Sequence, residues 1–358
     1  MLFKNIKKAL FISAFILFSQ VAATAQIEKG VTTLGGSLHF DYFRGGATST
    51  LTPSYGRFIT NKILIKGKLD AIFSKNSETN NSYKIYDFSP EIQYYFNPTS
   101  QWKFFVGTSA GLTALNFNYP RSGIRNYSSH DFHQSVYVGF NKFLNKEIAF
   151  EGTLGLSHSN LSLSQDLSVI GTYGLTNLYK TGLNLSINNY VNFKSKDVDF
   201  DGLISKGRSV IDGKISLNTY TGKQYDVKNN NNTIKVNGNY ASLNAEYGQF
   251  VMNGLLIGVK TNLILSDNVN TLGITPYAQY FYPISKRLMV NVKAEFNYNF
   301  IKNNRFGEYK AGLGLTYFLS KNVALDVNII NFNKTFNSSN LSNNAYKSSH
   351  IGLKFFLK

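Results

Sequence analysis

Apolar and polar residues alternate along many runs of this chain, and the alternation limits what the chain can fold into. In the stretch 63–73, for example, Ile65 and Phe73 fall in one phase, while Lys66 and Asp70 fall in the other. Successive side chains of a β-strand point to opposite faces, so such a run predicts a strand with one apolar face. Each run has about ten residues, the length at which a tilted strand crosses a bilayer.

Membrane-spanning helices are not expected after residue 25. After residue 25, no segment approaches the roughly 18 consecutive apolar residues that a spanning helix needs. The mean hydropathy of −0.17 is low, but lipid-facing and lumen-facing residues alternate in a membrane barrel, so the average conceals it. The 23 Tyr and 29 Phe favour strands. The sequence therefore predicts an all-β fold, an antiparallel transmembrane β-barrel.

The connections between the runs alternate in length. Short ones are predicted at 61–62, 97–101, 145–146, 253–254, 283–287 and 320–321, and long ones at 74–84, 118–130, 159–177, 222–233 and 334–348. Short turns at one end and long polar loops at the other are typical of outer-membrane barrels, whose turns face the periplasm. A soluble β-sandwich or lipocalin-like fold is the alternative, but it gives no reason for sorting loops by length.

The second half of the chain repeats the first half. FLNKEIAFE, beginning at Phe143, returns as FLSKNVALD, beginning at Phe318. Further matches join 27–30 to 204–207, 61–73 to 253–265, 88–96 to 274–282 and 102–111 to 286–295. Each copy holds about eight strands, which gives about 16 in total. We predict a first eight-strand repeat over 26–193, a periplasmic linker over 194–205 and a second eight-strand repeat over 206–358.

Each copy resembles the outer-membrane-protein β-barrel family, the eight-stranded barrels of OmpA/OmpX type, here as a tandem duplication. The resemblance rests on the first strand with Gly35-Gly36, on the strand–turn–strand FLNKEIAFEGTLG and on the apolar, aromatic final strand HIGLKFFLK. It covers the chain after residue 25 twice over. The resemblance implies an integral protein of the cell outer membrane of a Gram-negative bacterium, inserted by the barrel-insertion machinery.

Sixteen strands close as one barrel or as two barrels of eight, and the sequence favours one while leaving both open. Pairing of the Gly182 strand with the Gly207 strand would indicate one barrel, and pairing with the Gly30 strand would indicate two. One sixteen-stranded barrel would enclose a water-filled channel, lined by charged residues in the inward phase. The predicted pore-wall residues are Arg57, Lys66, Lys68, Asp70, Glu91, Glu151, Lys260, Lys293, Glu295 and Asp326.

These patterns predict a porin-like passive diffusion channel for small solutes. The alternative is a structural or adhesive outer-membrane protein of closed small barrels with surface-exposed binding loops. We expect no enzyme, cofactor, catalytic residue or metal site. His158 and Ser159 are adjacent, so they point to opposite faces, and His130 and His133 are too few ligands for a metal. A lipid-modifying enzyme would need a His and a Ser or carboxylate that converge at the outer rim.

The first 25 residues predict a secretory signal peptide. Lys4, Lys7 and Lys8 precede a short apolar stretch, and Ala23-Thr24-Ala25 fits the small-x-small cleavage rule. An N-terminal membrane anchor is the alternative, but the apolar stretch is short for a spanning helix. The net charge is +17, with basic residues scattered along an exported chain. We therefore expect outer-membrane lipid and lipopolysaccharide as partners, and no nucleic acid. The oligomeric state stays open.

Overall fold

The computed structural model describes residues 27–43, 46–76, 80–96, 102–119, 124–162, 174–190, 202–226, 232–266, 270–301, 304–337 and 344–357. Within them, no helix is long and apolar enough to cross a membrane. The described residues form eighteen strands. They are β1 (Thr32–Gly35), β2 (Ser37–Phe43), β3 (Gly46–Leu51), β4 (Ser54–Phe58), β5 (Ile63–Asn76), β6 (Asn81–Phe96), β7 (Trp102–Tyr119), β8 (Ile124–Phe143), β9 (Ile148–Ser162), β10 (Gly174–Asn189), β11 (Ser209–Asp226), β12 (Asn232–Met252), β13 (Leu255–Ser266), β14 (Asn270–Pro283), β15 (Leu288–Ile301), β16 (Asn304–Phe318), β17 (Val323–Asn337) and β18 (Asn344–Leu357).

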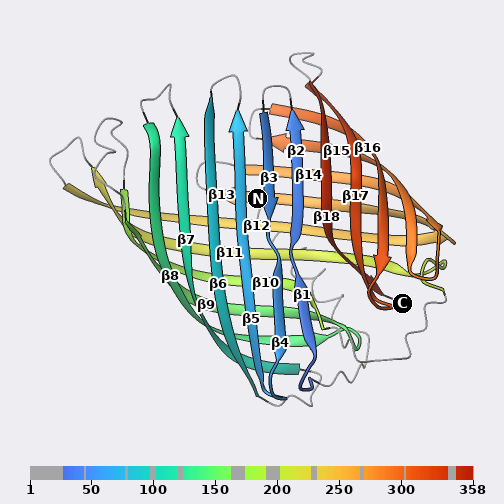
Figure 1. Ribbon diagram of the computed structural model, residues 1–358, viewed down its shortest axis with the longest axis horizontal. Coiled ribbons are helices and arrows are strands. Elements are labelled where there is room, and N and C mark those ends of the chain that lie inside the picture. The colour runs from blue at the N-terminus through green and yellow to red at the C-terminus, as the bar shows by residue number, and fades with distance from the viewer. Residues whose placement is uncertain are drawn as a thin grey trace, which may run out of the picture.

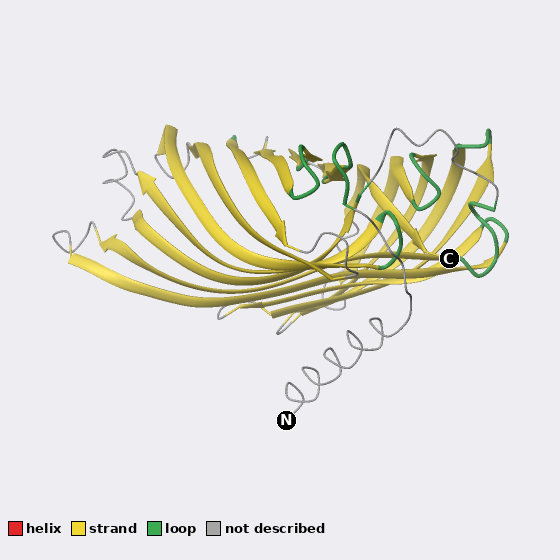
Figure 2. Cartoon of the chain, turned by 90° about the horizontal axis from the view of Figure 1, so that it is seen from below, coloured by secondary structure: helices red, strands yellow, loops and turns green. Residues whose placement is uncertain are grey.

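The eighteen strands make sixteen crossings of one closed, antiparallel barrel. β1 and β2 are two parts of one crossing, interrupted at Gly36, and β3 and β4 are two parts of the next, interrupted at Thr52 and Pro53. From β5 onward each strand pairs with the next, and β18 closes the barrel on β2. Figure 1 shows the blue-to-green strands of the first half in front, with β11 and β12 crossing behind them. Figure 2 shows how strongly the sheet curves.

Four crossings exchange partners between the two ends of the barrel. We call the end with the short turns, such as 144–147 and 319–322, the turn end, and the opposite end the loop end. Toward the loop end, β2 pairs with β18, and β10 pairs with β11. At the turn end, β1 lies beside β10, and β11 pairs with β18 through Ser209–Ile211. The barrel is therefore one ring of sixteen at the loop end and two rings of eight at the turn end.

We call the two eight-stranded rings lobe 1 (β1 and β4–β10) and lobe 2 (β11–β18). An apolar seam lies between them, built from residues near the turn ends of the strands: Leu144, Ile148, Ile187, Ile211, Leu319, Val323, Leu353, Phe355 and Leu357. The turns meet here too. Glu147 Oε2 accepts hydrogen bonds from Ser320 Oγ at 2.6 Å and from Asn322 Nδ2 at 3.0 Å. Burial of this apolar surface stabilises the divided end.

The two lobes have the same backbone hydrogen bonds at matching positions. In lobe 1, Gly30 N donates to Phe58 O at 2.8 Å; in lobe 2, Gly207 N donates to Phe250 O at 2.9 Å. The φ angles of the two glycines are +95° and +88°, in the left-handed region that favours glycine. The tandem duplication itself stays a prediction. The proposed signal peptide, 1–25, lies outside the described residues, as does most of the proposed linker.

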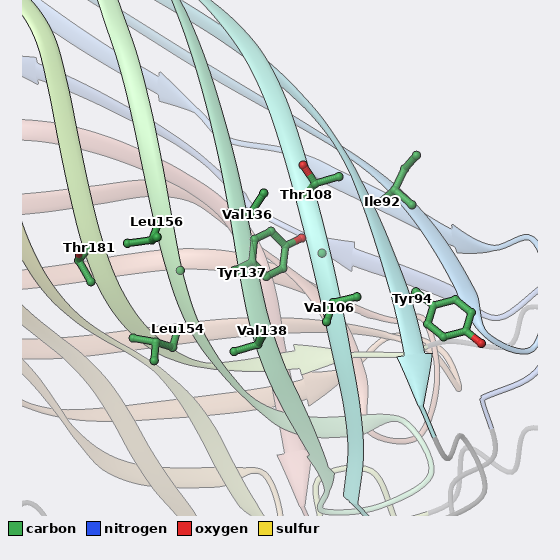
Figure 3. Close-up of a pocket in the computed structure, with 12 residues that line it drawn as sticks. Ile92, Tyr94, Val106, Thr108, Val136, Tyr137, Val138, Leu154, Leu156 and Thr181 are labelled. Carbon is green, nitrogen blue, oxygen red and sulfur yellow. The ribbon is translucent and has the colours of Figure 1, made fainter.

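The outer face of the wall is apolar. Side chains that point outward from β6 to β9 include Ile92, Val136, Leu154 and Leu156, all well exposed. Figure 3 shows them around a hollow in this wall. The barrel also exposes aromatic residues near its turn end, among them Tyr94, Phe96, Trp102, Tyr280 and Tyr282. An apolar band with an aromatic border is the outer surface of a barrel that sits in a bilayer.

The boundaries of all five predicted long loops were wrong, because 74–84, 118–130, 159–177, 222–233 and 334–348 each begin and end inside a strand. The polar stretch 74–84, for example, was expected to be a loop, but β5 runs to Asn76 and β6 starts at Asn81. β12 likewise reaches 21 residues and β8 reaches 20. Backbone hydrogen bonds between neighbouring strands continue beyond the membrane, where both faces of a strand are polar. The apolar–polar alternation therefore ends before the strand does. The expected sixteen-stranded barrel, by contrast, is confirmed.

Gly36 makes the partner exchange of the first crossing possible. Its φ is +100°, and an added Cβ would lie 1.8 Å from the carbonyl oxygen of Thr52. The opposite strand bends at the same level, where Ser37 N donates to Thr52 Oγ1 at 3.1 Å and Thr52 N donates to Ser37 O at 2.8 Å. The kink directs β1 toward β10 and β2 toward β18.

We expect Gly36→Ala to lower the free energy of unfolding by about 1–3 kcal/mol, because alanine is strained at this φ and its Cβ has no room. Urea unfolding of the barrel in phospholipid vesicles measures the change. Gly67→Ala in β5 is the matched control, since its Cβ would have 3.8 Å to the nearest atom. Equal losses for the two variants would show that the kink needs no glycine.

Candidate functional site

Aromatic rings from several strands meet inside lobe 1. Tyr95 of β6 is 0% exposed, and its ring centroid lies 5.2 Å from that of Phe58 in β4 and 5.0 Å from that of Phe105 in β7. Tyr190, just after β10, lies 4.9 Å from Phe143 of β8 and 6.3 Å from Phe58. Because these strands stand on different sides of the ring, their side chains fill its centre.

Polar groups hold this aromatic layer in place. Tyr95 Oη donates to Gln93 Oε1 at 2.7 Å and accepts from Asn141 Nδ2 at 2.9 Å. Gln93 Nε2 in turn donates to Glu91 Oε1 at 2.5 Å. Glu151 is 8% exposed. Glu91 therefore belongs to the hydrogen-bonded network around Tyr95, and Glu151 is buried in the same lobe.

Lobe 2 has a corresponding core. The ring of Phe250 lies 5.5 Å from Phe281 and 6.3 Å from Phe356, and Phe318 lies 4.9 Å from Phe356. All four side chains are at most 1% exposed. They come from β12, β14, β16 and β18, so this lobe is also filled across its width.

Ion pairs form the next layer of lobe 2. Glu295 accepts from Lys293 at 2.6 Å and from Lys260 at 2.7 Å through its Oε1 atom. Lys354 Nζ lies 3.4 Å from Asp326 Oδ2 and donates to Gln279 Oε1 at 2.6 Å. Buried charges of opposite sign are therefore paired and hydrogen-bonded, which offsets the cost of removing them from water.

The structure places nine of the ten predicted pore-wall residues on the inner face: Lys66, Lys68, Asp70, Glu91, Glu151, Lys260, Lys293, Glu295 and Asp326. Arg57 is the exception. It lies in phase with Tyr55, which is 53% exposed, and it pairs with outward-facing Ile65, while Phe58 takes the inward position. Arg57 is one residue from the turn end of β4, where a long basic side chain reaches the polar interface.

Sequence reasoning missed Arg208, which closes the turn end of lobe 2. Its Nη1 donates to Leu203 O at 2.6 Å, and its Nη2 donates to Lys321 O at 2.7 Å. The guanidinium also lies 5.5 Å from the centre of the Phe356 ring. Burial lowers the pKa of Arg208 to about 10. Arg208 precedes β11 outside any alternating run, so periodicity carried no signal for it.

A histidine, a serine and a carboxylate do converge, but on the inner face. His133 Nε2 lies 3.0 Å from Ser89 Oγ and 3.5 Å from Asp87 Oδ2, and Ser89 donates to Asp87 Oδ1 at 2.6 Å. A hydrolytic triad needs the acid on the other imidazole nitrogen, and a serine whose proton goes to the histidine. Here the carboxylate and the serine share one nitrogen, and Nδ1 faces Thr113 Oγ1 at 3.5 Å. The group does not form a triad.

Metal ligands do not gather in the part of the chain that the structure describes: no three His, Asp or Glu side chains lie close enough to hold an ion. The candidate site is the barrel interior. Aromatic and apolar side chains fill it in both lobes, and polar groups line it where the lobes join. Together with the closed sheet and the apolar outer band, this defines an outer-membrane-type β-barrel.

No family model matches the chain, and no curated protein matches it. Solved structures do. CdiB from Acinetobacter baumannii aligns at 10% identity and a TM-score of 0.44 over 91% of this chain and 60% of that one. CdiB from Escherichia coli aligns at 12% identity and a TM-score of 0.46, over 92% of this chain and 64% of that one. A bacterial polysaccharide outer membrane secretin aligns at 9% identity and a TM-score of 0.43, over 92% of this chain and 99% of that one. The chain thus spans less than two thirds of either CdiB. The fold of this chain is defined by its own strand pairing.

Proposed function

We propose that this chain is a non-enzymatic outer-membrane protein whose barrel is closed to passive diffusion at the turn end, which faces the periplasm. It would act as a surface-exposed binding or structural protein, with the shared lumen at the loop end accessible from outside. Outer-membrane lipid and lipopolysaccharide would surround it, and the barrel-insertion machinery would assemble it.

One observation carries the proposal: side chains from opposite walls touch inside each lobe. In lobe 1 the contact runs from Phe143 of β8 through Tyr190 to Phe58 of β4, and in lobe 2 it runs from Phe281 through Phe250 to Phe356. A passive channel needs a continuous water-filled path. These contacts leave the porin-like alternative dependent on the opening of at least one of the two cores.

Conductance in planar bilayers tests the proposal. We expect the reconstituted protein to give no stepwise current above the bare bilayer, because two aromatic cores block the path. A porin-like protein would instead give reproducible steps with mild anion preference from its basic character. Such steps in the unmodified chain would overturn the closed-barrel proposal and restore the diffusion channel. Heat-modifiable migration on gels is the control that the reconstituted protein is folded.

A further inference from the structure

Three lysines face the lumen where the two lobes join. They are Lys68 of β5, Lys180 of β10 and Lys214 of β11, and all three remain exposed. Lys180 and Lys214 each interact electrostatically with Lys68 and with each other. We call these three residues the junction lysines.

The strand register explains why residues so distant in sequence come together. Lys68 pairs with Ser54 of β4, and Ser54 pairs with Gly35 of β1. β1 lies beside β10, on which Ser186 pairs with Lys214 of β11. The partner exchange therefore brings β5 and β11 within reach across the mouth of lobe 1. Lys180 lies on the same face of β10 as Ser186, further toward the loop end.

Two of the junction lysines, Lys180 and Lys214, differ from the interior lysines of lobe 2 in their partners. Lys260, Lys293 and Lys354 each have a carboxylate within 3.8 Å. Of the junction lysines, Lys68 contacts Asp70. Across the described ranges, Lys180 and Lys214 form no ion pair. Lys214 interacts electrostatically with Asp70 as well, and Asp212 lies two residues from Lys214 on the same face of β11, opposite Glu246 of β12. Asp87, opposite Asp70, already accepts from Ser89 and Thr113 and contacts His133.

Three like charges in one wall repel one another, and this repulsion costs free energy unless an anion lies between them. Nearby hydroxyl and amide groups add neutral donors: Ser186 and Asn244 pair with Lys214, and Ser157 pairs with Lys180. These neighbours are polar and the three lysines are exposed, so their ammonium groups are available to a solute in the lumen.

We propose that the junction lysines form a binding site for a small multivalent anion that carries phosphate or carboxylate groups. The site rests on the proposed function, because it needs a lumen that is accessible from the loop end. It requires no movement of either lobe, since the cores lie on the turn-end side of the lysines. Its ligand is held by charge and by hydrogen bonds from ammonium groups, as an oligophosphate or a tricarboxylate would be.

Isothermal titration calorimetry of the folded barrel in uncharged detergent tests the site, with inorganic tripolyphosphate and citrate as probes. We expect saturable binding of at least one probe that weakens with added salt. The double variant Lys180→Gln/Lys214→Gln should lower the affinity by about tenfold or more, since each exposed contact is worth about a factor of five. Lys62→Gln/Lys206→Gln, with the same charge change in exposed turns of the other end, should leave it unchanged.

Two results would overturn the site: no binding of either probe, or an equal loss in the test and control variants. A further arm adds anionic phospholipid to the detergent. Competition with tripolyphosphate would identify lipid headgroups as the source of the anion, and its absence would identify a soluble one; either supports the site. Channel steps in bilayers together with lysine-dependent binding would overturn the closed barrel and keep the site. Bilayers without channel steps, together with no binding of either probe, would overturn the site and keep the closed barrel.

Discussion

Asp326→Ala is expected to be among the most destabilising single changes in this protein, lowering the free energy of unfolding by about 3–5 kcal/mol. Asp326 is 5% exposed and lies inside lobe 2. Its Oδ1 accepts from Thr316 Oγ1 at 2.6 Å, and its Oδ2 lies 3.4 Å from Lys354 Nζ. Without the carboxylate, Lys354 keeps a buried charge whose remaining partner is the neutral Gln279. Urea unfolding in phospholipid vesicles measures the loss.

The double variant Asp326→Leu/Lys354→Met is the matched control. It removes both charges and fills similar volume, so it should recover most of the stability lost by the single variant. If the single and double variants unfold alike, then the pairing of these charges does not stabilise lobe 2, and the loss comes from packing alone.

Tyr95→Ala is expected to have the second large effect, on stability and on closure together. Removal of a fully buried ring costs about 3–5 kcal/mol. The ring contacts Phe58 and Phe105, and its hydroxyl joins Gln93 to Asn141. Its loss leaves a cavity in the centre of lobe 1, between Phe58, Phe105 and Asn141. We therefore expect current steps in planar bilayers where the unmodified protein gives none.

Tyr94→Ala provides the control at the neighbouring position. Tyr94 is 39% exposed on the outer face, so its truncation should leave the bilayers silent and cost at most about 1 kcal/mol. Tyr95→Phe separates the ring from the hydroxyl: it should cost about 1–3 kcal/mol from the unsatisfied partners and give no current. Silence of Tyr95→Ala in a folded barrel would show that this ring does not seal lobe 1.

Several residues could be placed from the sequence because they obey local rules. The run 63–73 forms a strand with Lys66 inside and Ile65 outside, since the strand period leaves only two faces. The turn at Asn145 also follows from local chemistry: Asn145 Oδ1 accepts from the backbone N of Glu147 and of Ile148, both at 2.8 Å. Ser320 Oγ accepts in the same way from Asn322 and Val323.

Other residues could not be placed because their surroundings come from distant strands. Charge alone put Arg57 on the inner face, but the buried position belongs to Phe58, which meets Tyr95 and Tyr190 across lobe 1. The convergence of Ser89 and His133 depends on the register of β6, β7 and β8, which are joined by turns that do not reveal that register. The junction lysines come together through a partner exchange that no local pattern marks.

By itself, the sequence determined that this chain forms about sixteen antiparallel strands with one apolar face, where its short turns lie, and which residues face inward in most strands. These are consequences of a period of two and of turn chemistry, which act over a few residues. The number of lobes was decided only by the tertiary structure. Two closures use almost the same side chains, so Gly36 and the seam around Ile211 and Phe355 choose the partner at each level. The answer is one barrel at the loop end and two at the turn end, because backbone pairing and apolar burial favour different partners along the same four strands.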